Sequence, residues 1–174
     1  HPDSLRSVID LGVAKFKDIA VNEYGSRLFQ VVCALSSEFN TKALKLFEAN
    51  FDDLITNIAG SILLSRLIAT ADSELNYRFA IRKLEKNKSY LQKGYYNRML
   101  ATLVGTCSDT MASEVVNLIK NNVWVLMNDK FGNYVLQVLF TRDNQQAISL
   151  CKVACLRNAN NILFRKYPKY ILLK

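Results

Sequence analysis

Apolar and polar residues follow one another along this chain in blocks of helical length, with apolar side chains recurring every three or four residues. That spacing is typical of amphipathic helices, whereas a half-buried strand would alternate apolar and polar residues one by one. Polar segments interrupt the pattern at regular intervals, at 36–41, 70–74, 106–110 and 141–145. A stretch of helical composition follows each one, and Asp72, Ser108 and Asp143 are expected to cap the helices that begin there. The pattern predicts an all-α chain.

A repeat underlies these blocks. Segments Asn22–Gln30 and Asp129–Gln137 are alike, and their glycines, Gly25 and Gly132, lie 107 residues apart, close to three periods of 36. Three weaker copies complete the series, with spacings of 35, 36, 36 and 36 residues. The residues in the glycine position, called anchors below, are Gly25, Gly60, Tyr96, Gly132 and Pro168. Regular spacing of this kind is the signature of a repeat protein.

The anchors share the same surroundings. The residue before the anchor is aromatic in four copies, and the residues three and four after it are apolar in all five. Each unit therefore predicts a short helix, a second helix that begins near the anchor, a polar turn and a third helix. Such units must stack into a solenoid to bury their apolar faces, with Trp124 and most other aromatic residues between repeats. The expected division is the end of a preceding unit at 1–13, repeats at about 14–49, 50–85, 86–121 and 122–157, and a partial repeat at 158–174.

Composition and charge exclude some classes of fold and indicate a kind of partner. With 6 Gly and 2 Pro among 174 residues, turn residues are too few for an all-β sandwich or barrel. No apolar stretch approaches the roughly 18 residues of a membrane span, so we expect no membrane partner. Residues 1–80 carry a net charge of −2 and residues 81–174 a net charge of +10. That gradient fits a polyanionic partner, although a charge excess is often only a solvated surface. Since the chain opens at His1, inside a segment of helical composition, we expect it to be a piece of a longer protein.

Motifs of catalysis and metal binding are missing from the sequence. The four cysteines form no C-x-x-C pair, and His1 is the only histidine, which disfavours both a zinc site and a Cys–His pair. Cys151 and Cys155 are expected on one buried helix face. No phosphate-binding loop, dinucleotide-binding fingerprint or nucleophile elbow occurs. We expect no enzyme and no cofactor.

The candidate chemistry lies just after the anchor, at three positions of the second helix. The first position is polar in every copy, the second carries a planar side chain in four of five, and the fifth is Gln in two. Residues four apart share a helix face, so the first and fifth positions should form a polar pair that looks outward. A ladder of such pairs, with planar side chains between its rungs, suits the reading of unstacked bases one at a time. The candidate residues are Ser26, Gln30, Asn97, Asn133 and Gln137 for base edges, Arg27, Arg98, Tyr134 and Tyr170 for base stacking, and Ser61, Ser65 and Lys169 for weaker contacts.

These residues resemble the repeats of the Pumilio, or PUF, RNA-binding family. Gly-Asn-Tyr-x-x-Gln at Gly132–Gln137 is close to the family's signature, and Gly-Ser-Arg-x-x-Gln at Gly25–Gln30 is another of its forms. The resemblance implies a right-handed α-solenoid of three-helix repeats of about 36 residues, with single-stranded RNA on its concave face. It also implies that Asn133, Tyr134 and Gln137 read a uracil, and that the triplet at Ser26 reads an adenine three nucleotides to its 3′ side. The other three copies depart from the code.

The resemblance implies a regulator of messenger RNA that occupies 3′-untranslated elements in the cytoplasm and recruits regulatory proteins through its convex face. Two alternatives stay open. A nucleolar relative that acts on ribosomal RNA would read sequence loosely, and a protein-binding α-solenoid would use its basic half to meet an acidic partner.

Overall fold

The computed structural model describes residues 2–70, 73–162 and 164–172, and every regular element among them is a helix. This confirms the predicted all-α class. The chain divides into two compact units, unit 1 at His1–Asn76 and unit 2 at Tyr77–Lys174. The boundary falls within one helix, α7 (Ser73–Lys86).

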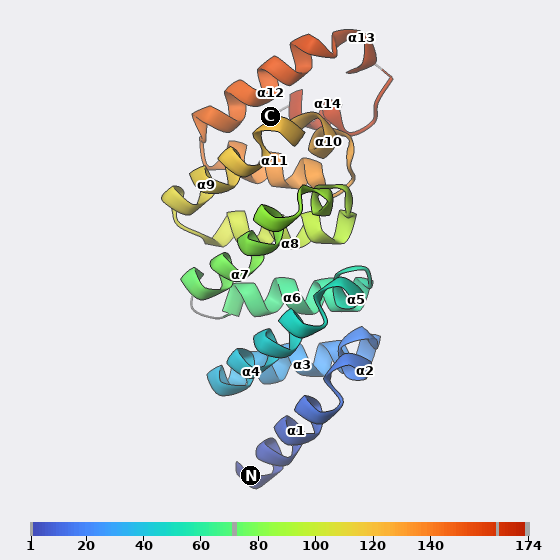
Figure 1. Ribbon diagram of the computed structural model, residues 1–174, viewed down its shortest axis with the longest axis vertical. Helices are drawn as coiled ribbons and strands as arrows, with labels where there is room; N and C mark the ends of the chain where they lie inside the picture. Colours follow the sequence, from blue (N-terminus) through green and yellow to red (C-terminus); the bar gives the residue numbers. More distant parts are fainter. Residues whose placement is uncertain (1, 71–72, 163, 173–174) are drawn as a thin grey trace. The chain divides into compact units, whose positions relative to one another are not determined.

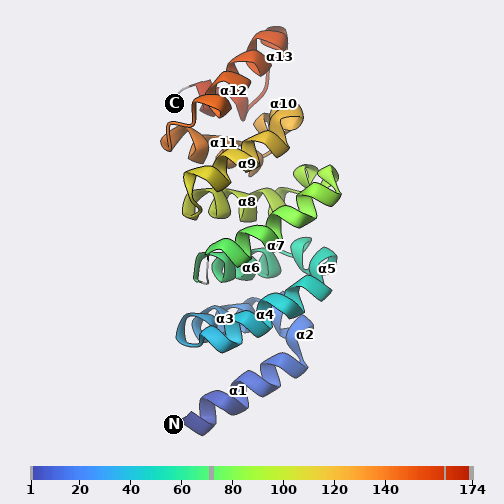
Figure 2. The same ribbon diagram turned by 60° about the vertical axis from the view of Figure 1, so that its left-hand side comes forward.

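Unit 1 repeats the expected order of one short and two long helices. Its helices are α1 (Pro2–Ala14), α2 (Phe16–Val21), α3 (Glu23–Leu35), α4 (Ser37–Ala49), α5 (Phe51–Ile55) and α6 (Ile58–Thr70). The second helices α3 and α6 lie side by side and make the most extensive contact in the unit (Figure 1). In Figure 2, α1 and α4 run parallel to each other and obliquely to α3. Unit 1 is therefore a two-layered stack, with second helices in one layer and third helices in the other.

Aromatic rings fill the core of unit 1, as the sequence predicts. The Phe29 ring stacks on Phe16, with centroids 5.5 Å apart, and meets Phe39 at 5.3 Å. Phe47 closes the cluster through an edge contact with Phe16 at 6.3 Å. All four side chains are at most 3% exposed. Because these rings come from α2, α3 and α4, they bind the three helices of one repeat together.

Unit 2 continues the same order. After the end of α7 its helices are the 3₁₀ helix η1 (Lys88–Gln92), α8 (Gly94–Thr106), α9 (Asp109–Ile119), the 3₁₀ helix η2 (Lys120–Asn122), α10 (Val123–Asn128), α11 (Gly132–Thr141), α12 (Gln145–Arg157), α13 (Ala159–Ile162) and α14 (Pro168–Leu172). The second helices α8 and α11 make the most extensive contact, and α14 packs on α11. The stacking of these helices, visible in Figure 1, confirms the predicted α-solenoid.

Some aromatic residues of unit 2 lie in its core and others do not. Tyr96 is fully buried and stacks on Tyr90 at 5.3 Å, while its hydroxyl donates to the Ala80 carbonyl. Trp124, in contrast, is only half-buried and lines a surface pocket. Three other residues of α10 already cover its core side, Val123, Leu126 and Met127. The expectation that Trp124 lies in the core is therefore wrong.

The anchor glycines allow the first and second helices of a repeat to approach closely. A Cβ atom at Gly25 would lie 2.6 Å from the Ile19 carbonyl oxygen, and one at Gly132 would lie 2.8 Å from that of Leu126. At Gly60 the equivalent atom would come closer still to the neighbouring backbone. The repeat with Tyr96 at its anchor differs, because a 3₁₀ helix rather than an α-helix precedes it. Glycine at the anchor is thus a packing requirement.

The predicted caps of the third helices can be checked at two of three positions. Ser108 accepts a hydrogen bond from the Met111 N–H, which confirms it as the cap of α9. Asp143 is wrong by one residue, because Asn144 caps α12 by accepting from the Ala147 N–H. Asp143 instead takes a left-handed backbone conformation, with φ of 52°, to complete the turn. Asp72 lies outside the described residues.

Candidate nucleic-acid interface

The second position after the anchor is accessible to a ligand in every repeat. Arg27 is exposed, and the rings of Tyr134 and Tyr170 are 51% and 47% exposed. Ile62 and Arg98 are half-buried. The planar side chains proposed for stacking therefore reach solvent at the second helices.

The first position is buried, contrary to expectation. Ser26, Ser61, Asn97 and Asn133 are at most 2% exposed, and only Lys169 in the partial repeat is exposed. The outward direction predicted for the first and fifth positions together is thus wrong for the first. The helix turns this position toward neighbouring backbone, where a polar side chain is stable only if it is hydrogen-bonded.

Backbone and neighbouring repeats supply those bonds. The Ser26 hydroxyl donates to the Ala59 carbonyl at the start of α6, at 3.0 Å, and so links two second helices. The Asn97 amide of α8 donates to the Leu91 carbonyl at 2.9 Å and to the Asp129 carboxylate at 3.0 Å. These first-position side chains hold successive repeats in register.

In α11 the first position also orients the fifth. The Asn133 amide nitrogen donates to the carbonyls of Asp129, at 3.0 Å, and Lys130, at 2.6 Å, while its oxygen accepts from the Gln137 amide. Gln137 is half-buried, and its amide oxygen and second N–H make no other hydrogen bond among the described residues. The same relay occurs in α3, where the Gln30 amide donates to the Ser26 hydroxyl at 3.4 Å. Gln137 therefore keeps hydrogen-bonding capacity for a ligand, and Gln30 holds the corresponding place in α3.

A hollow of about 400 Å³ in unit 1 brings one complete triplet together. Ser26, Arg27 and Gln30 of α3 line it on one side, and Ile62 of α6 lies opposite. The hollow thus joins the triplet of one repeat to the second position of the next. A planar ligand can enter between a guanidinium and an aliphatic side chain, with the Gln30 amide at its edge.

Glu23 offsets the positive charge of Arg27 in this hollow. Its carboxylate pairs with the Arg27 guanidinium four residues on, at 2.7 Å, and both side chains are more than two-thirds exposed. Glu23 lines the same hollow. Since the pair holds the guanidinium on the helix surface and offsets its charge, Arg27 is better suited to stacking than to capturing phosphate.

The remaining candidates are less complete. The Ser65 hydroxyl donates to the carbonyl of Ser61 at 2.9 Å, so its donor is used within α6. The Asn97 amide oxygen is buried without a hydrogen-bond partner, and Ala101 at the fifth position cannot supply one. Lys169 and Tyr170 of α14 are exposed. Unit 2 therefore carries one well-formed triplet, in α11, and unit 1 one in α3.

The sequence analysis missed the residues that start the second helices. Asn22, Asn57 and Asp129 stand three residues before their anchors, and each accepts hydrogen bonds from the N–H groups of the anchor and the residue before it. Asn or Asp recurs there in three of five copies, which was a readable capping signal. The Asp129 carboxylate also accepts a hydrogen bond from the Asn97 amide, and this bond connects the third and fourth repeats.

Cysteine chemistry is suppressed by burial. Cys33, Cys107 and Cys151 are buried and Cys155 is half-buried, so the expected shared burial of the last two holds fully only for Cys151. Burial raises the pKa of Cys33 and of Cys151 to about 12, which keeps both thiols protonated at neutral pH. The described part of the chain holds no group of three or more His, Cys, Asp or Glu side chains that could bind a metal ion.

None of the described helices combines the length and apolar character needed to cross a membrane.

Known proteins resemble this chain in structure rather than in sequence. No protein-family model and no curated protein matches the sequence. Among solved structures, a Puf4 double mutant bound to a Cox17 RNA 3′ UTR recognition sequence is similar with a TM-score of 0.80 at 14% identity, over 98% of this chain and 58% of that one. PUF-8 in complex with PBE-RNA is similar with a TM-score of 0.78 at 17% identity, over 96% of this chain and 49% of that one. The RNA-binding domain of yeast Puf5p bound to SMX2 RNA is similar with a TM-score of 0.71 at 21% identity, over 98% of this chain and 51% of that one.

The chain spans about half the length of these structures, and the likeness extends over nearly all of it. Since identity is at most 21% in these three pairs, what is shared is the arrangement of helices. The helix order, the anchor glycines and the stacked second helices agree with that result. The chain has the fold of the Pumilio repeat domains.

Proposed function

We propose that this chain binds single-stranded RNA along its second helices, with a preference for sequence at two positions. The observation that carries the proposal is the hollow of unit 1, where Ser26, Arg27 and Gln30 face Ile62 of the next repeat. Arg27 and Ile62 would enclose a base, and Gln30 would meet its edge. In unit 2, Tyr134 and Gln137 would do the same.

Phosphate contacts would supply much of the affinity. Only two triplets are complete, so base-edge contacts are few. The net charge of +10 over residues 81–174 can attract the RNA backbone without regard to sequence. Affinity for single strands falls with salt at a log–log slope of about −0.7 per phosphate neutralised. We therefore expect a steep salt dependence and modest discrimination between bases.

The similar structures favour messenger RNA as the target. Puf4 is bound there to a 3′ UTR recognition sequence, and PUF-8 is bound to PBE-RNA. By the family's code, the α11 triplet would read a uracil and the α3 triplet an adenine three nucleotides to its 3′ side. Regulation of messenger RNA through a 3′-untranslated element, in the cytoplasm, follows as the proposed role.

Selection from a random pool of single-stranded RNA tests the proposal. We expect the bound sequences to be enriched for a uracil followed by an adenine three nucleotides to its 3′ side, with tolerance elsewhere. Recovery of double-stranded RNA, or of a pool with no positional preference at all, would contradict sequence reading by these helices.

A matched pair of arginine variants tests the location. Arg27→Ala removes a stacking partner, which costs about 1–3 kcal/mol per base and so weakens binding about five- to 150-fold. Arg82→Ala removes an equally charged, exposed side chain from the third helix α7. Its effect should be confined to a small change in the salt slope. Equal losses in the two variants would mean that charge alone drives binding.

A further inference from the structure

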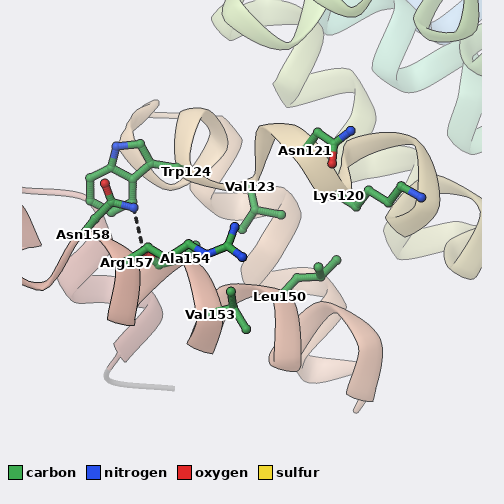
Figure 3. Close-up of a pocket in the computed structure, with 9 residues that line it drawn as sticks. All are labelled: Lys120, Asn121, Val123, Trp124, Leu150, Val153, Ala154, Arg157 and Asn158. Atoms are coloured by element: carbon green, nitrogen blue, oxygen red, sulfur yellow. Dashed lines mark hydrogen bonds between the residues drawn. The ribbon is translucent and has the colours of Figure 1, made fainter.

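A pocket of about 250 Å³ lies on unit 2 away from the second helices. Its walls come from η2 and α10 on one side and from α12 on the other (Figure 3). Trp124 of α10 lies at one end beside Asn158, and Leu150 and Val153 of α12 lie toward the other. None of the first-, second- or fifth-position residues lines it. The pocket, called the Trp124 pocket below, is therefore separate from the proposed RNA face.

The pocket combines apolar side chains with two basic ones. Val123, Trp124, Leu150 and Val153 present aliphatic and aromatic surface, and Val153 is 43% exposed. Exposed apolar groups next to a pocket are typical of an interaction site.

Two cations stand at the pocket, Lys120 of η2 and Arg157 at the end of α12. Within the described residues neither forms a salt bridge. No acidic residue occurs in the sequence after Asp143, so α12 carries no carboxylate to offset them. In Figure 3 the Arg157 side chain extends along the pocket, with its guanidinium turned toward the interior. Both charges are thus available to a ligand.

We propose that the Trp124 pocket binds an acidic peptide segment of a partner protein, with one apolar side chain of that segment inserted beside Trp124. Carboxylates on either side of the inserted residue would pair with Lys120 and Arg157. The volume suits a single large side chain rather than a long groove-bound helix.

The lining favours a peptide over a second RNA site. Recognition of a base needs free edge partners beside the stacking surface, and the amide side chains that line the pocket are Asn121 and Asn158. The Asn158 amide already donates to the Ala154 carbonyl, at 2.8 Å. Val123, Leu150, Val153 and Ala154 supply aliphatic surface beside Trp124, and this surface suits Leu, Ile or Phe of a peptide.

Panning of a displayed library of random twelve-residue peptides on the 174-residue chain tests the proposal, with counter-selection on the K120E/R157E double variant. Trp124 is the only tryptophan, so its fluorescence reports occupancy of this pocket directly. We expect the selected peptides to carry Asp or Glu within about three residues of a large apolar residue, and to shift Trp124 emission. The double variant should bind them at least about tenfold more weakly, as for charge pairs at an interface.

Lys152→Glu provides the matched control, because Lys152 is an exposed cation of α12 that does not line the pocket. It should change peptide affinity by less than about twofold, since exposed charges at a distance are screened. Circular dichroism establishes that each variant is folded.

The proposal is overturned if the selected peptides lack acidic residues, if they are not enriched over the counter-selection, or if K152E loses as much affinity as the double variant. A shift of Trp124 emission by single-stranded oligouridylate or oligoadenylate would assign the pocket to RNA instead. Because RNA affinity is measured separately on the Arg27 variant, failure here leaves the proposed RNA binding standing.

Discussion

Single replacements of Asn133 and Gln137 distinguish a side chain that stabilises the fold from one that reads a base. Asn133 is 2% exposed and donates to two backbone carbonyls, whereas Gln137 is half-buried and donates only to Asn133. Asn133→Ala should therefore lower the free energy of unfolding, while Gln137→Ala should mainly lower RNA affinity. The code taken from the PUF resemblance treats the two side chains as equal readers of a base edge.

The magnitudes follow from the bonds that each variant loses. Asn133→Ala removes the two hydrogen bonds that its amide donates to the Asp129 and Lys130 carbonyls, at about 1 kcal/mol net for each bond, and deprives Gln137 of its acceptor, for a total of about 2–3 kcal/mol. Gln137→Ala removes one bond of a half-buried side chain, at most about 1 kcal/mol. In a chain of this size, about 1 kcal/mol corresponds to a change in Tm of roughly 2–4 °C. The two variants should thus differ by several degrees.

Thermal unfolding followed by circular dichroism gives the stability, and competition between two RNAs that differ only at the assigned uracil gives the discrimination. We expect Gln137→Ala to lose most of the discrimination with a nearly unchanged Tm. Asn133→Ser, which keeps an acceptor for Gln137 as Ser26 does for Gln30, should retain part of the discrimination. The reasoning is refuted if Asn133→Ala unfolds like the wild type, or if Gln137→Ala lowers Tm as much as Asn133→Ala does.

Three further outcomes concern stability. Gly60→Ala should lower the free energy of unfolding by about 1–3 kcal/mol, because its Cβ would meet backbone. Gly105→Ala should be neutral or stabilising in chemical denaturation, because its Cβ would make only an ordinary contact with the Val138 side chain, at 3.7 Å. Arg142→Ala should cost about 2–4 kcal/mol, and Arg142→Lys nearly as much, because the guanidinium donates to two carbonyls near the end of α8, at 2.6 and 2.7 Å. Burial raises the folded-state pKa of Cys33 and Cys151 to about 12, so the stability from their protonated thiols is present below the ordinary thiol pKa and lost as pH rises toward 12. Unfolding measured from pH 8 to 12 should show a slope reduced by up to about 1.4 kcal/mol per pH unit for each thiol replaced by Ala, and an unchanged slope would contradict the assigned burial.

The repeat could be predicted from sequence because its signals were periodic. The anchors Gly25, Gly60 and Gly132 and the apolar residues after them recur at nearly constant spacing, and the structure places short and long helices in the predicted order. Exposure of the second position could also be foreseen, since a helix that buries the residues three and four after the anchor turns Tyr134 away from them.

Burial of the first position could not be predicted from the helical pattern alone. Whether Asn133 faces solvent depends on how closely the backbone of α10 and its turn approach α11, which is a tertiary property. Leu28 shows the opposite effect. Leu28 follows its anchor by three residues and is apolar as the pattern requires, yet it is 50% exposed, whereas Phe29 beside it is 1% exposed. Trp124 was likewise assigned to the core from its residue type, whereas its neighbours on α10 already fill that space.

Photocrosslinking tests RNA binding by the second helices most directly. A single-stranded RNA pool that contains 4-thiouridine is irradiated in complex with the 174-residue chain, and the crosslinked residues are identified by mass spectrometry. We predict that crosslinks concentrate on α3 and α11, at Arg27 and Tyr134, and that competition with excess unlabelled RNA removes them. Crosslinks concentrated instead on the third helices, for example on residues 82–88 of α7, would contradict the account.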